Sequence, residues 1–138
     1  MNIENRQKNI QLEWEKGKEA FREAQVLLEQ NLPTGAISRA YYAAFHAGKT
    51  ILLSEGLEAK SHQGLGRLFS LHFVKSGRLD VRFSRILSKA QKYREEADYS
   101  SEYVFTLDDA KERIREIQEF IETTADFLKK AGYPVDAN

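Results

Sequence analysis

Apolar residues recur every three or four positions along most of the chain, which is the period of an amphipathic α-helix. The first stripe consists of Ile10, Trp14, Gly17, Phe21, Ala24 and Leu28. The tetrapeptide Asn31-Leu32-Pro33-Thr34 then ends one helix and opens the next, with the proline near the first turn, where it is tolerated. No run alternates apolar and polar residues with β-branched enrichment, so we expect no strands.

The segment from about Thr34 to Glu55 is apolar on almost every side. A helix of that kind is typical of the middle of a domain, so we expect it to be the central helix. Its many alanines and Gly48 would allow neighbouring helices to approach closely. Gly56 is a suitable C-terminal stop.

Three further helices follow, with capping residues at their starts. They run from His62 to about Lys75 after Ser61, from Asp80 to about Tyr99, and from Thr106 or Asp108 to about Ala131. The loop between the last two holds Tyr103 and Phe105, which we expect to pin it to the core. The sequence therefore predicts an all-α fold, an up-and-down antiparallel bundle of four main helices and one short helix. We expect one domain over residues 1–138, with helices from about 5 to 131 and a frayed tail over 132–138.

Size and composition agree with one domain of this kind. The chain has 138 residues and no cysteine, which excludes disulfides and thiolate zinc sites. Its N-terminus lacks the apolar core of a signal peptide, and no run approaches the ~20 apolar residues of a membrane helix. We therefore expect a cytoplasmic location and no contact with a membrane.

Charge is balanced over the whole chain, with 21 Lys plus Arg and 21 Asp plus Glu. That balance argues against a protein that coats DNA generally, because such binding depends on neutralising many phosphates. A local basic patch is still possible. The stretch from 75 to 94 carries Lys75, Arg78, Arg82, Arg85, Lys89, Lys92 and Arg94 against Asp80 alone.

The end of the fourth helix holds the first candidate site, which consists of Arg94, Asp98 and Tyr99. Arg94 and Asp98 are four apart and share a helix face, so a simple ion pair explains them equally well. Arg94 also falls close to the inward stripe of Ala90 and Ala97, and a partly buried arginine needs a partner. The same three groups together could bind a phosphate.

A second candidate set lies along the predicted central helix. Arg39, Tyr42, His46 and Lys49 step by three, four and three residues, which forms one polar line on an apolar helix. His46 could act as a general base, or it could be a hydrogen-bonded core histidine. Ser61-His62-Gln63 opens the third helix and could bind an anion or serve only as a cap. With three scattered histidines and no cysteine, we expect no metal site and no cofactor.

Three blocks together resemble small prokaryotic HEPN-domain proteins (higher eukaryotes and prokaryotes nucleotide-binding domain). They are Ser38-Arg39-Ala40-Tyr41-Tyr42-Ala43-Ala44-Phe45-His46-Ala47, then Ser61-His62-Gln63-Gly64 with Phe69 and Phe73, and Arg94-Glu95-Glu96-Ala97-Asp98-Tyr99. The resemblance covers about Glu15 to Lys130, with the blocks in the family's order. It implies an all-α bundle that commonly dimerises and is involved with nucleotides or RNA. It also implies pairing with a minimal nucleotidyltransferase, as in toxin–antitoxin and related pairs.

Active members of that family are metal-independent RNases, and here the sequence departs from their pattern. Their motif is an arginine, four to six residues and a histidine on a late helix at a dimer cleft. Arg94 matches the arginine, but Tyr99 follows after four residues where a histidine would stand. A phenol with an ordinary pKa near ~10 is a poor base at neutral pH. Arg39 and His46 have the right separation, but they lie on the second helix.

Three hypotheses follow from this comparison. The first is a nucleotide- or RNA-binding module, a homodimer paired with a nucleotidyltransferase, in which Arg94 holds phosphate, Asp98 orients it and Tyr99 bonds or stacks. Arg39, His46 and His62 are second-rank candidates for the same site. The second is a metal-independent RNase toxin using Arg94 with His46 or His62. The third is a structural dimerisation or interaction protein whose polar cluster only specifies helix packing.

Overall fold

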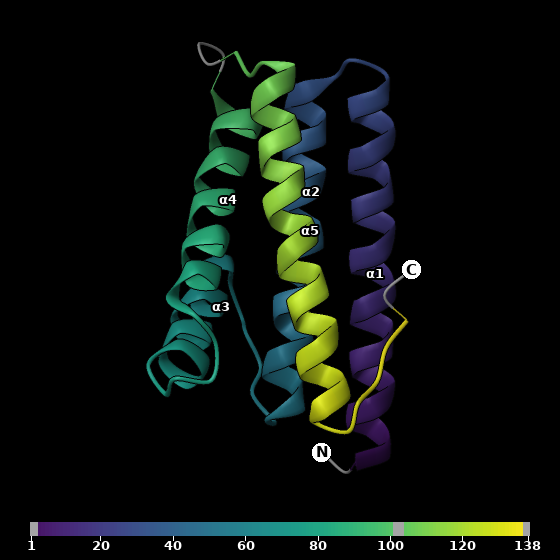
Figure 1. The fold of residues 1–138 in the computed structure, drawn as a ribbon, viewed down its shortest axis with the longest axis vertical. Helices are drawn as coiled ribbons and strands as arrows, with labels where there is room; N and C mark the ends of the chain where they lie inside the picture. The colour runs from purple at the N-terminus through teal and green to yellow at the C-terminus, as the bar shows by residue number, and fades with distance from the viewer. Residues whose placement is uncertain (1–2, 101–103, 137–138) are drawn as a thin grey trace.

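A computed structural model describes residues 3–100 and 104–136, and its regular elements are all helical (Figure 1). They are α1 (Ile3–Glu29), α2 (Pro33–Ser54), α3 (His62–Phe69), the π-helical segment η1 (Ser70–Val74), α4 (Val81–Tyr99) and α5 (Leu107–Lys130). Within those ranges no strand occurs. The predicted all-α bundle of four main helices and one short helix is confirmed.

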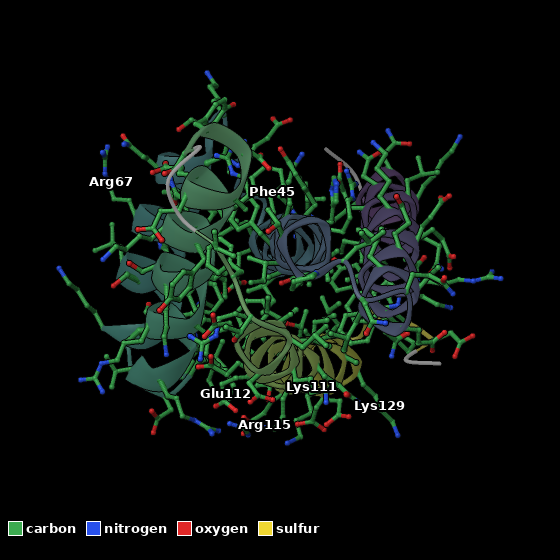
Figure 2. All side chains as sticks on the ribbon, turned by 90° about the horizontal axis from the view of Figure 1, so that it is seen from above. Phe45, Arg67, Lys111, Glu112, Arg115 and Lys129 are labelled. Atoms are coloured by element: carbon green, nitrogen blue, oxygen red, sulfur yellow. The ribbon has the colours of Figure 1, made fainter. Side chains whose placement is uncertain are left out.

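Helix α2 is the centre of the bundle, as its apolar composition predicts. It packs against α1, α3, α4 and α5. Seen from above, α1 lies on one side of α2, α4 on the other and α5 against a third, while Phe45 lies on the side opposite α5 (Figure 2). Residues on all these sides are buried, including Ala36, Ala40, Ala44, Ile51 and Leu52.

Close contact between α1 and α2 depends on Gly17. A Cβ atom at this position would lie 3.3 Å from the Ala43 carbonyl oxygen and 3.3 Å from the Cβ of His46. The absence of a side chain therefore lets α1 approach α2 closely at this point. This proximity brings the outer part of α2 within reach of polar residues on α1.

The predicted caps of the later helices are confirmed, and one ambiguity is resolved. The Ser61 and Asp80 side chains accept hydrogen bonds from the backbone N–H groups of Gly64 and Arg82. Thr106, rather than Asp108, caps α5. Its hydroxyl accepts from the Asp109 N–H while the Asp109 carboxylate accepts from the Thr106 N–H, which completes a capping box.

The third helix differs from its prediction in one respect. Instead of continuing as α-helix to about Lys75, it ends at Phe69 and widens into the π-helical η1, where the Lys75 N–H bonds the Ser70 carbonyl. Phe69 and Phe73 are both buried. Because they are four residues apart whichever helical geometry joins them, the apolar pattern could not reveal the wider turn.

The segments that precede and follow α5 each pack against another helix of the bundle. Phe105 is buried with its ring centroid 5.7 Å from that of Tyr93, as expected for a pinned loop; Tyr103 lies outside the described residues. The tail expected after α5 is described as far as residue 136, and there it follows the helix without regular structure. The Trp14 indole N–H donates to the Asp136 carbonyl at 2.6 Å, and the tail runs back along α1 (Figure 1).

Candidate functional site

Arg94 is a core residue rather than a surface one. It lies one turn from the end of α4, on the stripe that includes the buried Ala90, and only 7% of its surface is exposed. Arg94 is therefore not part of an exposed ion pair of the kind considered from the sequence. Its guanidinium carbon lies 5.3 Å from the ring centroid of Tyr41, 6.0 Å from that of Tyr42 and 5.8 Å from that of Tyr99. Such distances allow cation–π attraction from all three rings.

The polar partners of Arg94 leave part of its guanidinium unused. Its Nη1 is 3.5 Å from Asp98 Oδ2, and it makes a side-chain hydrogen bond to Tyr99. The Asp98 Oδ1 atom accepts instead from the Ser38 hydroxyl at 2.8 Å. Arg94 Nε is buried and has no hydrogen-bond partner among the described residues. Burial opposes the charge, but neighbouring oxygens, those of Tyr42 first, outweigh it, so the pKa of Arg94 is raised.

Tyr41 connects Arg94 to His62 at the start of α3. The Tyr41 oxygen is 2.5 Å from His62 Nδ1, and the two ring centroids are 5.4 Å apart. Burial raises the pKa of the Tyr41 phenol, so it keeps its proton. Burial, followed by the charge of Arg94, lowers the pKa of His62, which favours the neutral imidazole.

These facts assign the His62 tautomer. A buried phenol needs an acceptor for its proton, and His62 Nδ1 is the partner that the described structure gives it. The Tyr41 hydroxyl therefore donates to Nδ1, and the proton of the neutral ring sits on Nε2. His62 is thus prepared to donate a hydrogen bond beside Arg94 rather than to accept a proton there.

His46 belongs to a different cluster, on the α1 side of α2. Its Nδ1 lies 2.7 Å from Glu13 Oε2, and Lys49 Nζ lies 3.3 Å from Glu13 Oε1. The hydrogen bond to His46 and the charge of Lys49 outweigh burial and lower the pKa of Glu13 to about 2. An ionised Glu13 can only accept, so His46 Nδ1 carries a proton toward it. Phe45 lies between this Glu13–His46 pair and the Arg94 cluster, with its ring centroid 5.5 Å from that of His46 and 4.6 Å from that of His62, and the charge of His46 also acts on His62.

Arg39 lies at the other end of the same face of α2. Its Nε is 3.6 Å from the Glu23 carboxylate of α1, and its guanidinium carbon is 4.9 Å from the Tyr42 ring centroid. Tyr42 therefore has guanidinium groups of both Arg39 and Arg94 within 6.0 Å of its ring centre. The predicted polar line of Arg39, Tyr42, His46 and Lys49 is divided, because its last two members turn to Glu13.

The structure thus brings together Arg94, Asp98 and Tyr99, with Arg39 and His62 joined to them through Tyr42 and Tyr41. His46 has no direct contact with Arg94 in the described structure. Three contributing residues were not singled out from the sequence, namely Tyr41, Ser38 and Glu13. Tyr41 and Ser38 lie within the block that carries the family resemblance, whereas no local signal marks Glu13 among the charged residues of α1.

Other types of site find no support in the described ranges. Among residues 3–100 and 104–136, no group of three histidine or acidic side chains is placed to hold a metal ion. None of the helices in these ranges is long and apolar enough to cross a membrane.

Comparison with known proteins identifies the family. Residues 10–128, which include every member of the Arg94 cluster, match the HEPN domain. The chain is a member of the HEPN domain family. The resemblance seen in the three sequence blocks is therefore confirmed.

Relatives of this HEPN domain come from archaea and bacteria. It is 36% identical over 107 residues to "Putative toxin MJ0605" of Methanocaldococcus jannaschii, covering 78% of this chain and 79% of the relative. It is 27% identical over 114 residues to "Putative toxin MJ0142" of the same organism, covering 83% and 78%. It is 29% identical over 119 residues to a "UPF0332 protein" of Thermotoga maritima, covering 84% and 90%.

Proposed function

We propose that this HEPN domain is a nucleotide- or RNA-binding module whose phosphate site is Arg94. One observation carries the proposal: a guanidinium in the core whose Nε has no partner in the described structure and whose carboxylate contact is long. Buried polar groups are normally satisfied, so an unused donor in a fixed position suggests an absent acceptor. A phosphate oxygen is a suitable acceptor because it matches the planar fork of arginine.

The neighbouring residues have separate roles in this proposal. Asp98, held by Ser38, orients the guanidinium and does not touch the phosphate, because two anions would repel. Tyr99 is 79% exposed with its ring near Arg94, so it can stack on a base or bond a ribose. His62 donates from Nε2 to a phosphate oxygen. Arg39, across the Tyr42 ring, holds a second phosphate.

The test is a binding titration with ATP and short RNAs. Arg94→Met removes the charge but keeps an apolar side chain of similar length, and we expect it to weaken binding at least tenfold. Arg113→Met is a matched control. Arg113 is also mostly buried, with its guanidinium carbon 5.1 Å from the Tyr93 ring centroid and its Nη1 buried without a hydrogen-bond partner in the described structure, but its Nη2 lies 2.9 Å from Glu116 on α5. The control should bind as the parent does.

Unchanged binding in Arg94→Met would overturn the phosphate role. The parent protein could also bind no nucleotide or RNA at all, while Arg94→Met is folded and no less stable. That result would support the third hypothesis, a structural interaction protein.

A second candidate function is a metal-independent RNase toxin. The Glu13–His46 pair favours it, because a carboxylate that fixes Nδ1–H leaves Nε2 available to take a proton. Two relatives also carry toxin in their names. Induced expression with growth monitoring tests this function. Toxicity that is lost in His46→Ala, together with RNA cleavage by the purified protein that EDTA does not abolish, would favour the RNase over the binding module.

A homodimer and a minimal nucleotidyltransferase partner complete the proposal. Both are features that the family resemblance implies, and a cytoplasmic location belongs to the same picture. Light scattering of the purified chain tests the dimer. Co-expression with the product of the neighbouring gene tests the partner, and failure of a neighbouring nucleotidyltransferase to co-purify would count against it.

A further inference from the structure

A cleft between α3 and α4 begins at the Tyr41–His62 pair and has a volume of about 790 Å³. Its basic lining residues are Arg67, Arg85, Lys89 and Lys92. Its other lining side chains are neutral polar or apolar, together with the His62 imidazole, and no carboxylate of the described residues lines it. The chain as a whole is electrically balanced, so this cleft is a local concentration of positive charge.

Most of that charge is not neutralised by the protein itself. Lys89 Nζ is 3.6 Å from Glu116, whereas Arg67, Arg85 and Lys92 have no carboxylate within 4 Å in the part of the chain that the structure describes. The nearby Arg78 and Arg82, outside the cleft, are each paired with a glutamate. Arg67 extends away from the bundle into solvent (Figure 2). Arg85 and Lys92 of the basic stretch seen in the sequence therefore line the cleft without a carboxylate partner, and Arg67 adds a third such charge from α3.

The rest of the lining fits a nucleic-acid backbone better than a peptide. Ser70, Ser84 and Ser88 line the cleft, and the Ser84 Oγ atom, just below its surface, has no hydrogen-bond partner in the described structure. Serine hydroxyls commonly bond phosphate and sugar oxygens. Leu65 and Leu87 are buried in the floor and offer no exposed anchor of the kind on which peptide interfaces depend.

We propose that this cleft holds the backbone of a single-stranded polynucleotide that continues from the phosphate bound at Arg94. The inference rests on the proposed function and specifies its ligand as a polynucleotide rather than a free mononucleotide. His62 and Tyr41 belong both to the cleft lining and to the Arg94 cluster, so one strand can pass from one to the other. The volume is that of a pocket for one drug-sized ligand, which suits a short stretch of single strand.

The test measures affinity against ligand length by competition, using uridine monophosphate and oligouridylates up to an octamer. We expect the octamer to compete at least tenfold more strongly than the mononucleotide. The double variant Arg85→Glu/Lys92→Glu should lose most of that gain and keep its mononucleotide affinity within about twofold. Its salt dependence should weaken by a slope of about 1.4, the value for two phosphate contacts to a single strand.

A control with the same change in net charge is Lys111→Glu/Lys129→Glu, because both lysines lie on α5 away from the cleft (Figure 2). It should retain the length dependence. The milder pair Arg85→Gln/Lys92→Gln, with melting curves for every variant, separates lost binding from lost folding.

Three results would overturn the inference: an octamer no tighter than the mononucleotide, a cleft variant that keeps the full gain, or an acidic peptide that competes as well as RNA through the same residues. Absence of binding by mononucleotide and octamer alike would instead remove the proposed function itself.

Discussion

The guanidinium of Arg94 lies against the ring of Tyr41, with 5.3 Å between the guanidinium carbon and the ring centroid. Because the Tyr41 hydroxyl also bonds His62, one tyrosine on α2 connects the end of α4 to the start of α3. The Arg94 guanidinium and the His62 imidazole therefore contact the same side chain, whose hydroxyl also determines the His62 tautomer. This relationship defines the candidate site more closely than the short sequence motif around Arg94 does.

Replacing Arg94 by methionine should leave the domain stable. The buried guanidinium has an unsatisfied Nε and a long contact to Asp98, so removing it relieves desolvation while most of the apolar packing is kept. Asp98 is not left buried and unpaired, because its side chain is 28% exposed and accepts from the Ser38 hydroxyl. We expect the free energy of unfolding to change by less than about 1 kcal/mol, or to rise. Arg94→Ala, which also loses the contacts to three tyrosine rings, should cost about 1–3 kcal/mol. Urea unfolding of both variants measures the difference, and a large loss in the methionine variant would show that the Arg94 charge itself stabilises the fold.

Replacing Tyr41 by phenylalanine should change the titration of His62. The phenol donates to Nδ1 only while the imidazole is neutral, so losing that hydrogen bond should raise the pKa of His62. Stability should fall by about 1 kcal/mol, the usual net contribution of one hydrogen bond. NMR of the histidine ring nitrogens measures both the pKa and the tautomer.

Tyr42→Phe is the matched control for that experiment. The Tyr42 ring is 6.2 Å from that of His62, but no hydrogen bond joins the two in the described structure. The control should leave the His62 titration unchanged. A spectrum of the parent protein in which the proton sits on Nδ1 would contradict the assigned tautomer.

Much of the fold could be predicted from the sequence because helical periodicity is a local signal. The stripe through Ile10 and Trp14, the caps at Ser61 and Asp80, and the central place of α2 each depend on neighbouring residues alone. The π-helical turn at 70–74 could not be predicted, because the spacing of Phe69 and Phe73 fits either geometry.

The candidate site was predictable only in part, for a similar reason. Arg94 and Asp98 are one helix turn apart, so their contact is local. The bond between Tyr41 and His62 joins two helices, and the bond between Glu13 and His46 joins two others. Contacts of that kind depend on how helices pack, which a single sequence does not show.

Glu13 should make the domain sensitive to acid. Its pKa is about 2 in the folded state, below the ordinary 4.5 of a glutamate in the unfolded chain, so its ionised form stabilises the folded state fully above pH 4.5. That contribution is lost as the pH falls from about 4.5 towards 2. Glu13→Gln should therefore lower the free energy of unfolding by about 2 kcal/mol at pH 7, with a smaller difference at pH 3. Glu19→Gln, an exposed residue on the same helix, should have little effect at either pH, and equal sensitivity of both variants would contradict the role given to Glu13.

We expect the packing of the C-terminal tail against α1 to stabilise the domain. The fluorescence of the single tryptophan of the chain reports on that packing directly. Trp14 is 1% exposed, and its indole N–H donates to the Asp136 carbonyl. A variant that ends at Gly132 loses this acceptor and the partly buried Tyr133 and Val135, so stability should fall by about 1–2 kcal/mol. Trp14 emission should shift to the red and acrylamide quenching should increase. Asp136→Asn keeps the backbone carbonyl that accepts from Trp14 and removes the charge that pairs with Lys18 at 3.5 Å, so its emission should match that of the parent. An unchanged spectrum in the truncated variant would show that α1 and its neighbours bury Trp14 without help from the tail.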